Sequence, residues 1–265
     1  MHSPDAQTYV TLKPGSAHYY VARFAAPAEH QAVTSWLAWF AQLDQMTDNI
    51  KDPGVARLKL DWWHAEIDQL DQARHPLAQA LKPWVQAPWQ IKQMHRVLFG
   101  IEQHIQKKSP VNIAELTDQC DQAGASRALL LANNADAELQ AQATILGRYH
   151  AVVARLQQLH HDLRHDYVSL PLVLLREPRI ALDVAAVSAS PDWVPTLEAL
   201  LAPFEAPVLQ AMPKLRREPR LHNPLRQTAQ ALQVVRLMRQ QRFAYQQHHW
   251  KLSPIRYLWH AWRMR

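Results

Sequence analysis

The chain has 265 residues, of which 48% are hydrophobic and 20% are charged, so it can bury a large core and is not intrinsically disordered as a whole. Five glycines against eighteen prolines disfavour a glycine-turned β-sandwich and any nucleotide fold that needs a glycine-rich phosphate loop. We therefore expect an all-α protein.

The charge is distributed unevenly along the chain. Residues 207–265 hold twelve Lys or Arg and a single acid, Glu218, and carry +11, whereas residues 1–206 carry −5; the whole chain is at +6. This asymmetry predicts a basic C-terminal face that could meet phosphate or an anionic membrane, and the alternative is a solvated helix face. Because the basic residues alternate with core-type apolar positions rather than exposed aromatics, we do not expect nucleic-acid binding.

Cysteine usage and the N-terminal sequence indicate the compartment. The single cysteine, Cys120, cannot form an internal disulfide, and the first ten residues, MHSPDAQTYV, lack the apolar run of a secretory signal. The longest apolar stretches, such as residues 128–132, are far shorter than the roughly 18–20 residues that span a bilayer. We expect a cytoplasmic protein, or one that lies peripherally on the inner face of the membrane.

Apolar residues recur at the three-and-four spacing of amphipathic helices along most of the chain. In the first helix they are Val33, Trp36, Leu37, Phe40, Leu43, Met46 and Ile50. Prolines and turn residues divide the pattern. In chain order the expected helices cover 28–50, 55–71, 76–81, 89–106, 113–133, 135–165, 192–204 and 224–249, with a last one after Pro254. No repeat or long linker interrupts them, so residues 1–265 are expected to form a single domain.

Two pairs of acids stand four residues apart. Asp44 and Asp48 would lie one turn apart on one helix face, where a cation could relieve their repulsion; Asp162 and Asp166 repeat this spacing. The alternative is that all four are surface acids. Of the neighbouring histidines only His161 and His165 could bind one metal together, so we do not expect a zinc site.

The last helix combines aromatic and basic residues. Ile255, Trp259 and Trp262 recur at i, i+4 and i+7, and Arg256, His260 and Arg263 follow one position later. This pattern predicts a membrane-facing helix on anionic headgroups, with Arg256, Trp259, Trp262 and Arg263 at the interface. Alternatively, both tryptophans pack onto the bundle.

Six segments resemble the squalene/phytoene synthase family. KLDWWHAEI (59–67) and HPLAQAL (75–81) are similar to the family's "L-x-W-W-R-x-E-L … H-P-V-A-x-A-L" signature, and HYY (18–20) with Pro27 is similar to its opening "S-F-Y … L-P". LDQMTD (43–48) stands where the first aspartate-rich box belongs. Residues 146–171 fit the second box without a gap, and WKLSPIRYL (250–258) resembles the family's last motif.

The resemblance implies an isoprenoid synthase-type helical bundle with two aspartate boxes facing each other across a central cavity. Family enzymes bind Mg²⁺ there and join two prenyl diphosphates head to head. Carried onto this chain, the metal-binding residues would be Asp44, Asp48 and Asp162. The residues placed to bind the substrate would be Tyr20, Gln45, Gln158, His161 and Tyr167. The sequence names no catalytic residue.

Both boxes depart from the family pattern. Gln45 and Gln158 replace acids, Ala41 and Gln157 replace arginines, and Ala154 replaces an asparagine; Asp166-Tyr167 stand for Gly-Arg. Each glutamine removes a full negative charge from a site that must offset the dehydration of Mg²⁺. Losing the arginines removes bidentate donors suited to diphosphate oxygens. We therefore expect Mg²⁺ to bind weakly, if at all.

Two functional hypotheses remain open. The one we favour is a relative with reduced or lost catalysis that keeps a cavity for an isoprenoid diphosphate or other prenyl lipid and acts through binding. Mitochondrial complex I assembly factors that resemble this family have similarly degenerate boxes, so a respiratory-complex protein is a candidate partner. The alternative is an active Mg²⁺-dependent head-to-head prenyltransferase.

Overall fold

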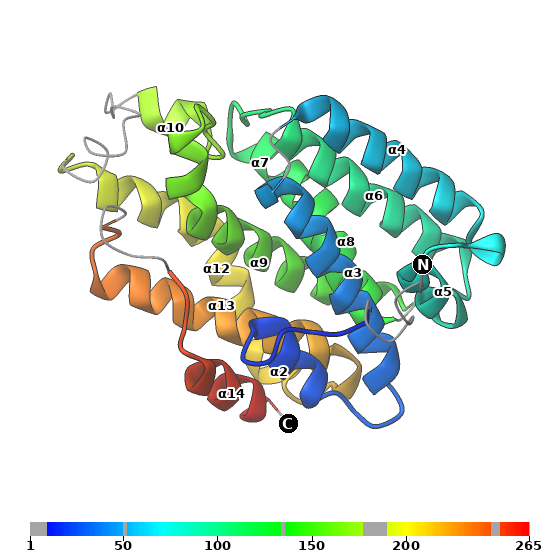
Figure 1. Ribbon diagram of the computed structural model, residues 1–265. Helices are drawn as coiled ribbons and strands as arrows, with labels where there is room; N and C mark the ends of the chain where they lie inside the picture. The colour runs from blue at the N-terminus through cyan, green and yellow to red at the C-terminus, as the bar shows by residue number, and fades with distance from the viewer. Residues whose placement is uncertain (1–9, 50–51, 134–135, 177–189, 245–249, 265) are drawn as a thin grey trace.

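The computed structural model describes residues 10–49, 52–133, 136–176, 190–244 and 250–264, and these residues form helices and turns without a β-strand. The all-α prediction is confirmed. The main helices, in chain order, are α2 (Ala17–Arg23), α3 (His30–Asn49), α4 (Pro53–Asp68), α5 (Pro76–Leu81), α6 (Pro88–Ile105), α7 (Ile113–Cys120), α8 (Ser126–Ala132), α9 (Ala137–Arg164), α10 (Leu172–Arg176), α12 (Trp193–Leu215), α13 (His222–Gln240) and α14 (Pro254–Trp262). Figure 1 shows their arrangement.

Several helices begin where side chains cap the first turn. Ser16 accepts the N–H of Tyr19 at the start of α2, and Asp52 accepts the N–H of Gly54 at the start of α4. His75 caps α5 through its ring nitrogen. These caps satisfy N–H groups that the first turn of a helix leaves without partners.

The long helix α9, of 28 residues, runs through the middle of the bundle, with α12 and α13 on one side and α6 and α8 on the other (Figure 1). Two groups of buried apolar side chains form the core. One involves α9, α12 and α13, with residues such as Leu156, Leu197 and Val235. The other lies between α3, α4, α5 and α6 and includes Trp39 and Trp63.

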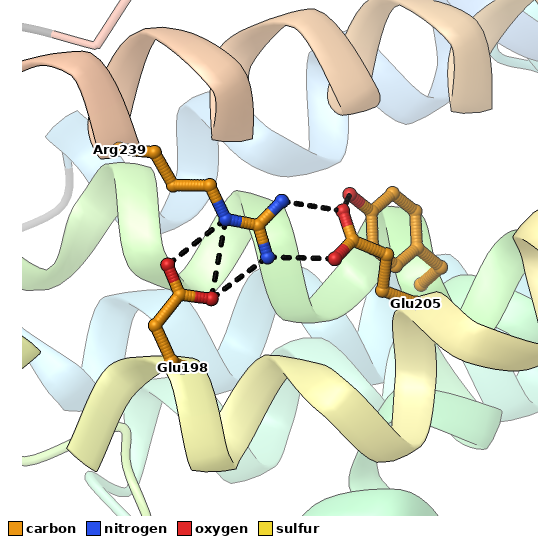
Figure 2. A network of polar contacts seen from close by, with 4 residues as sticks. Glu198, Glu205 and Arg239 are labelled. Carbon is orange, nitrogen blue, oxygen red and sulfur yellow. Dashed lines mark hydrogen bonds and ion pairs between the residues drawn. The ribbon is translucent and has the colours of Figure 1, made fainter. Parts of the chain in front are cut away.

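An ion-pair network joins α12 to α13 and reaches α9 (Figure 2). Arg239 donates to both carboxylate oxygens of Glu198, at 2.8–3.1 Å, and to both of Glu205, at 2.6 and 2.9 Å. Glu205 also accepts the hydroxyl of Tyr149 at 3.3 Å. One guanidinium thus holds two turns of α12 against α13.

The expected helix over 113–133 is interrupted. A π-helical turn, Asp121–Ala125, separates α7 from α8. Within it, Gly124 crosses Gly147 of α9 so closely that a Cβ on either glycine would overlap the carbonyl oxygen of the other. The apolar periodicity continues across the turn, which is why the sequence pattern predicted an unbroken helix.

Helix α12 is longer than expected, because it continues beyond residue 204 to Leu215 through Pro203, Pro207 and Pro213. Each internal proline costs about 3 kcal/mol. Six buried apolar side chains along the helix each contribute about 1.5–3 kcal/mol and outweigh this cost; they are Leu197, Leu200, Leu201, Phe204, Val208 and Leu215. The expected end of α13 at residue 249 was also too late, because Arg242 and Phe243 adopt positive φ after Gln240.

Candidate functional site

The carboxylate of Asp44, in the first acid box, is engaged by an arginine of the same chain. Arg127 of α8 donates from Nη2 to Oδ1 at 2.6 Å and from Nη1 to Oδ2 at 3.1 Å. The guanidinium also lies over the ring of Phe40, one turn before Asp44, with 5.2 Å between Cζ and the ring centroid. The two-pronged pair is the strongest geometry open to a carboxylate and a guanidinium.

The surroundings of Asp44 hold it ionised. Burial acts to raise the pKa of its carboxyl, but Arg127, His18 and His150 together lower the pKa below its usual value. His150 itself has a pKa lowered to about 4, first by burial and then by His18 and Arg127, with Asp44 opposing. Burial likewise lowers the pKa of His18. At neutral pH the imidazole of His150 is therefore uncharged, and the guanidinium of Arg127 supplies a full positive charge beside Asp44.

The second box centres on Asp162 of α9, whose side chain is 2% exposed. His104 of α6 places Nε2 3.7 Å from its Oδ1, and His161 places Nδ1 at 3.9 Å. The carbonyl oxygen of Asp162 accepts the N–H groups of His165 and Tyr167 at the end of the helix. The carboxylate thus lies among imidazoles.

His104 lies beside Asp162 and within electrostatic reach of the first box. Its pKa is lowered to about 4, first by burial and then by Arg155 and His161, while Asp44 acts to raise it. It therefore lies close to Asp162 and within electrostatic reach of Asp44. Tyr167 packs its ring edge-to-face on His104, with 5.1 Å between centroids, and is itself buried.

The other residues assigned from the family pattern are placed differently. Gln45 points to solvent from α3, and Gln158 is partly buried on α9. Tyr20, on α2, is partly buried. Asp48 belongs to the last turn of α3, but its side chain lies outside the described residues.

One glutamine and two histidines near the second box make contacts within the protein. Gln157, which stands where the family has an arginine, donates from Nε2 to the carbonyl oxygen of Trp250. The rings of His161 and His165 lie 4.2 Å apart between centroids. Position 157 therefore joins α9 to the C-terminal segment rather than offering a diphosphate donor.

These donors do not fit the expected magnesium site. Magnesium prefers six oxygen ligands in octahedral geometry, but both oxygens of Asp44 accept from Arg127, and Asp162 has imidazole neighbours. Within the part of the chain that the structure describes, no three His, Cys, Asp or Glu side chains are grouped so as to hold a metal ion. The expectation that Asp44, Asp48 and Asp162 bind Mg²⁺ stays a prediction. The contacts of Asp44 and Asp162 argue against it.

Comparison with known proteins identifies the family. The profile of the squalene/phytoene synthase family matches residues 12–256. The chain belongs to this family. The resemblance based on the six sequence segments is thereby confirmed.

The fold agrees with a solved structure of similar length. The chain is similar to the crystal structure of a dehydrosqualene synthase in complex with ligand, with a TM-score of 0.75 and 15% sequence identity, over 94% of this chain and 90% of the other. This likeness shows the isoprenoid synthase fold. A search of curated proteins gives no significant match.

Sequence reasoning missed the cations and imidazoles that surround the acids. Arg127 lies 83 positions from Asp44, in a segment without a family motif, so no local spacing pointed to it. His18 lies in the opening motif and His150 lies within residues 146–171, but the family pattern assigns neither a role, and His104 lies outside every motif. The available signal was a basic or imidazole residue on each helix expected to face a box.

A surface hollow of about 360 Å³ lies away from both boxes. It lies where the N-terminal end of α9 meets the C-terminal end of α12, and charged residues such as Glu138, Lys214 and Arg217 line much of it. Along α9, Asp136 and Asp162 are roughly 40 Å apart at 1.5 Å per residue. This hollow is not the prenyl-lipid cavity expected between the boxes, and that cavity stays a prediction.

The residues expected to face a membrane lie on α14 at the surface. Ile255, Trp259 and Trp262 are 72%, 51% and 45% exposed, and Arg256 and Arg263 are exposed as well. Both tryptophans are thus about half exposed, which differs from the alternative in which they pack onto the bundle. A search of the described helices finds none with the length and apolar character needed to cross a bilayer.

Proposed function

We propose that this chain is a squalene/phytoene synthase-like protein that has lost the prenyltransferase reaction and acts through binding. The observation that carries the proposal is the ion pair between Arg127 and Asp44. In the first box, the chain itself supplies the positive charge that the family's enzymes take from magnesium. The carboxylate is thereby committed to the fold.

The energetic argument concerns displacement. A magnesium ion at Asp44 would have to shed tightly held water and break a bidentate, charge-assisted pair that is partly buried. Gln45 and Gln158 stand where the family has two acids, so the negative charge that would compensate for this cost is missing. The imidazoles of His18 and His150 lie within electrostatic reach of Asp44, and imidazole is a poor match for magnesium.

The ligand class we propose is isoprenoid: a prenyl diphosphate or another prenyl lipid held without chemistry. A role in respiratory-complex assembly, through a protein partner, is the biological setting we favour. It is supported by the degenerate boxes, which the chain has in common with the assembly factors that resemble this family. We place the protein in the cytoplasm in this proposal.

An active magnesium-dependent prenyltransferase is the second candidate. What favours it is the retention of Asp44 and Asp162, with His104 3.7 Å from Asp162 and within electrostatic reach of Asp44. Such an enzyme would have to operate with fewer acids than its relatives. Its signature would be a head-to-head hydrocarbon product.

The deciding experiment incubates the purified chain with farnesyl or geranylgeranyl diphosphate and Mg²⁺, extracts with organic solvent and analyses for head-to-head products. We expect none above a blank without protein. A parallel titration of each diphosphate in EDTA measures metal-free binding, which we expect to be retained. Head-to-head products that disappear when Mg²⁺ is withheld would overturn the proposal in favour of the enzyme.

A further inference from the structure

Helix α14 presents an apolar and a basic stripe side by side on the surface. Ile255, Trp259 and Trp262 follow one another at one-turn spacing and are about half exposed or more. The rings of Trp259 and Trp262 lie 5.3 Å apart between centroids, and the guanidinium of Arg263 lies 5.8 Å from the ring centroid of Trp259. With the exposed Arg256, these five residues form what we call the α14 face.

The other side of α14 is fixed to the bundle. Ala261 is fully buried, and the helix packs against α2 and α13 (Figure 1). The carbonyl oxygen of Tyr257 accepts from Nε2 of Gln230 at 3.4 Å, and its hydroxyl accepts the N–H of Leu252 at 3.3 Å. The position of α14 is therefore fixed by packing and hydrogen bonds, and the exposure of its tryptophans does not come from fraying of the helix end.

The charge around α14 has one sign. The three packed helices α2, α13 and α14 contain no Asp or Glu. Arg23, Arg236, Arg256 and Arg263 are exposed on them or directly after them. Arg236, Arg256 and Arg263 all act electrostatically on His260 of α14, which places these cations within one field.

We propose that the α14 face docks on an anionic lipid surface, with Ile255, Trp259 and Trp262 in the interfacial layer and the neighbouring arginines on the lipid phosphates. Tryptophan is favoured at this depth because its ring is apolar and its N–H is polar. Arginine binds phosphate oxygens through a planar fork and extends over apolar surface. A short helix lying in the plane of the membrane needs both features.

Charge complementarity favours lipid over a second copy of the chain. In a twofold dimer the same patch meets itself, so Arg256 and Arg263 would face their own counterparts with no acid on the three helices to pair with them. A continuous anionic surface suits all the cations at once. The inference does not depend on whether the protein is an enzyme.

The test is co-sedimentation of the full chain with vesicles of phosphatidylcholine alone or mixed with phosphatidylglycerol. We expect binding to the mixed vesicles, weakening as salt is added because exposed charges are screened. Changing Arg256→Glu together with Arg263→Glu should reduce the partition coefficient by about tenfold or more, since each cation near an anionic leaflet contributes measurably. Equal binding to both vesicle types would overturn the proposal.

A matched control makes the same charge change elsewhere. Arg216 and Arg217 are exposed at the end of α12, and Arg216→Glu with Arg217→Glu should keep most of the binding; an equal loss would show that net charge alone is measured. The variant Ile255→Ser, at the most exposed position of the face, should weaken binding with an unchanged melting temperature. A dimer in sedimentation that Ile255→Ser dissolves, without vesicle binding by the native chain, would assign the face to a second copy.

Discussion

Arg127 and Asp44 form a two-pronged ion pair between α8 and α3, with nitrogen–oxygen distances of 2.6 and 3.1 Å. In this chain the first acid box therefore has a cation of its own. Helix α8, which carries Arg127, contributes Ala128 to one buried group of side chains and Leu130 to the other. We propose that this one arginine both forms an interhelical contact and lowers the affinity of the first box for a metal ion.

Magnesium binding is the first quantity to measure. We expect the native chain to bind Mg²⁺ with a dissociation constant of about a millimolar or weaker, and Arg127→Met to bind it at least tenfold more tightly, because the variant releases both oxygens of Asp44. Calorimetry provides the measurement.

A second arginine provides the control for that comparison. Arg148 makes an equivalent two-pronged pair, at 2.7 and 2.8 Å, with Asp121 rather than with Asp44. Arg148→Met should leave magnesium binding unchanged. Micromolar affinity in the native chain, or equal tightening in both variants, would contradict the role given to Arg127.

Stability should fall on mild acidification. The pKa values of His104 and His150 are about 4 in the folded chain, chiefly because of burial, against an ordinary value near 6.5. Between pH 6.5 and pH 4 the unfolded state binds protons that the folded state does not, so stability is complete above pH 6.5 and is lost as pH falls through this window. We expect a decrease of about 1–2 kcal/mol for each histidine between pH 7 and pH 5.

Urea unfolding at several pH values measures this dependence. His150→Asn should flatten the slope between pH 7 and pH 5. His222→Asn, at the start of α13, should keep the native slope. If the slope survives the loss of both His104 and His150, other groups govern the acid response.

The glycine crossing should tolerate no side chain. Gly147→Ala inserts a Cβ into the backbone of Gly124, and overpacking of this kind costs about 1–3 kcal/mol or more. Gly54→Ala, in the first turn of α4, meets only the Oδ1 atom of Asp52 at 3.1 Å and should be nearly neutral. Melting temperatures of the two variants check the contrast; equal shifts would mean that α8 and α9 can separate at little cost.

Arg239 should contribute to stability through its two glutamates. Arg239→Met removes the cation between Glu198 and Glu205, leaving Glu205 with 12% of its side chain exposed and without its guanidinium. Because Arg239 is itself 37% exposed, we expect a modest loss of about 1–3 kcal/mol in denaturant unfolding. The doubly changed chain with Glu205→Gln should recover part of the loss, because it removes the charge left without its guanidinium; no recovery would show that this charge is not the source of the loss.

Helices with a continuous apolar stripe could be predicted from the sequence. α3 was expected over 28–50 and spans His30–Asn49, and α9 was expected over 135–165 and spans Ala137–Arg164. The seven-residue α2 was not predicted, because two turns give too few apolar repeats to establish a period. The prolines of α12 predicted that this helix ends near residue 204, but burial of its apolar side chains allows it to continue to Leu215.

The candidate site was predictable only on its acidic side. The spacing of Asp44 and Asp48, and the motif around Asp162, could be read locally. The pairing of Arg127 with Asp44 arises from two helices brought together by the fold, over 83 positions, and no local pattern contains it. The lowered pKa values of His104 and His150 likewise arise from burial, and burial of a histidine is not apparent from its place in the sequence.

The crossing of Gly124 and Gly147 has a consequence for recognising related sequences. Arg127 follows the first glycine by three positions and His150 follows the second by three. Each residue therefore lies within one helical turn of the point where the two backbones touch. The close approach of the backbones thus brings both toward Asp44. A relative that combines Gly-x-x-Arg and Gly-x-x-His at these two places with depleted acid boxes should carry the same internal cation, and this paired spacing can be searched for without a structure.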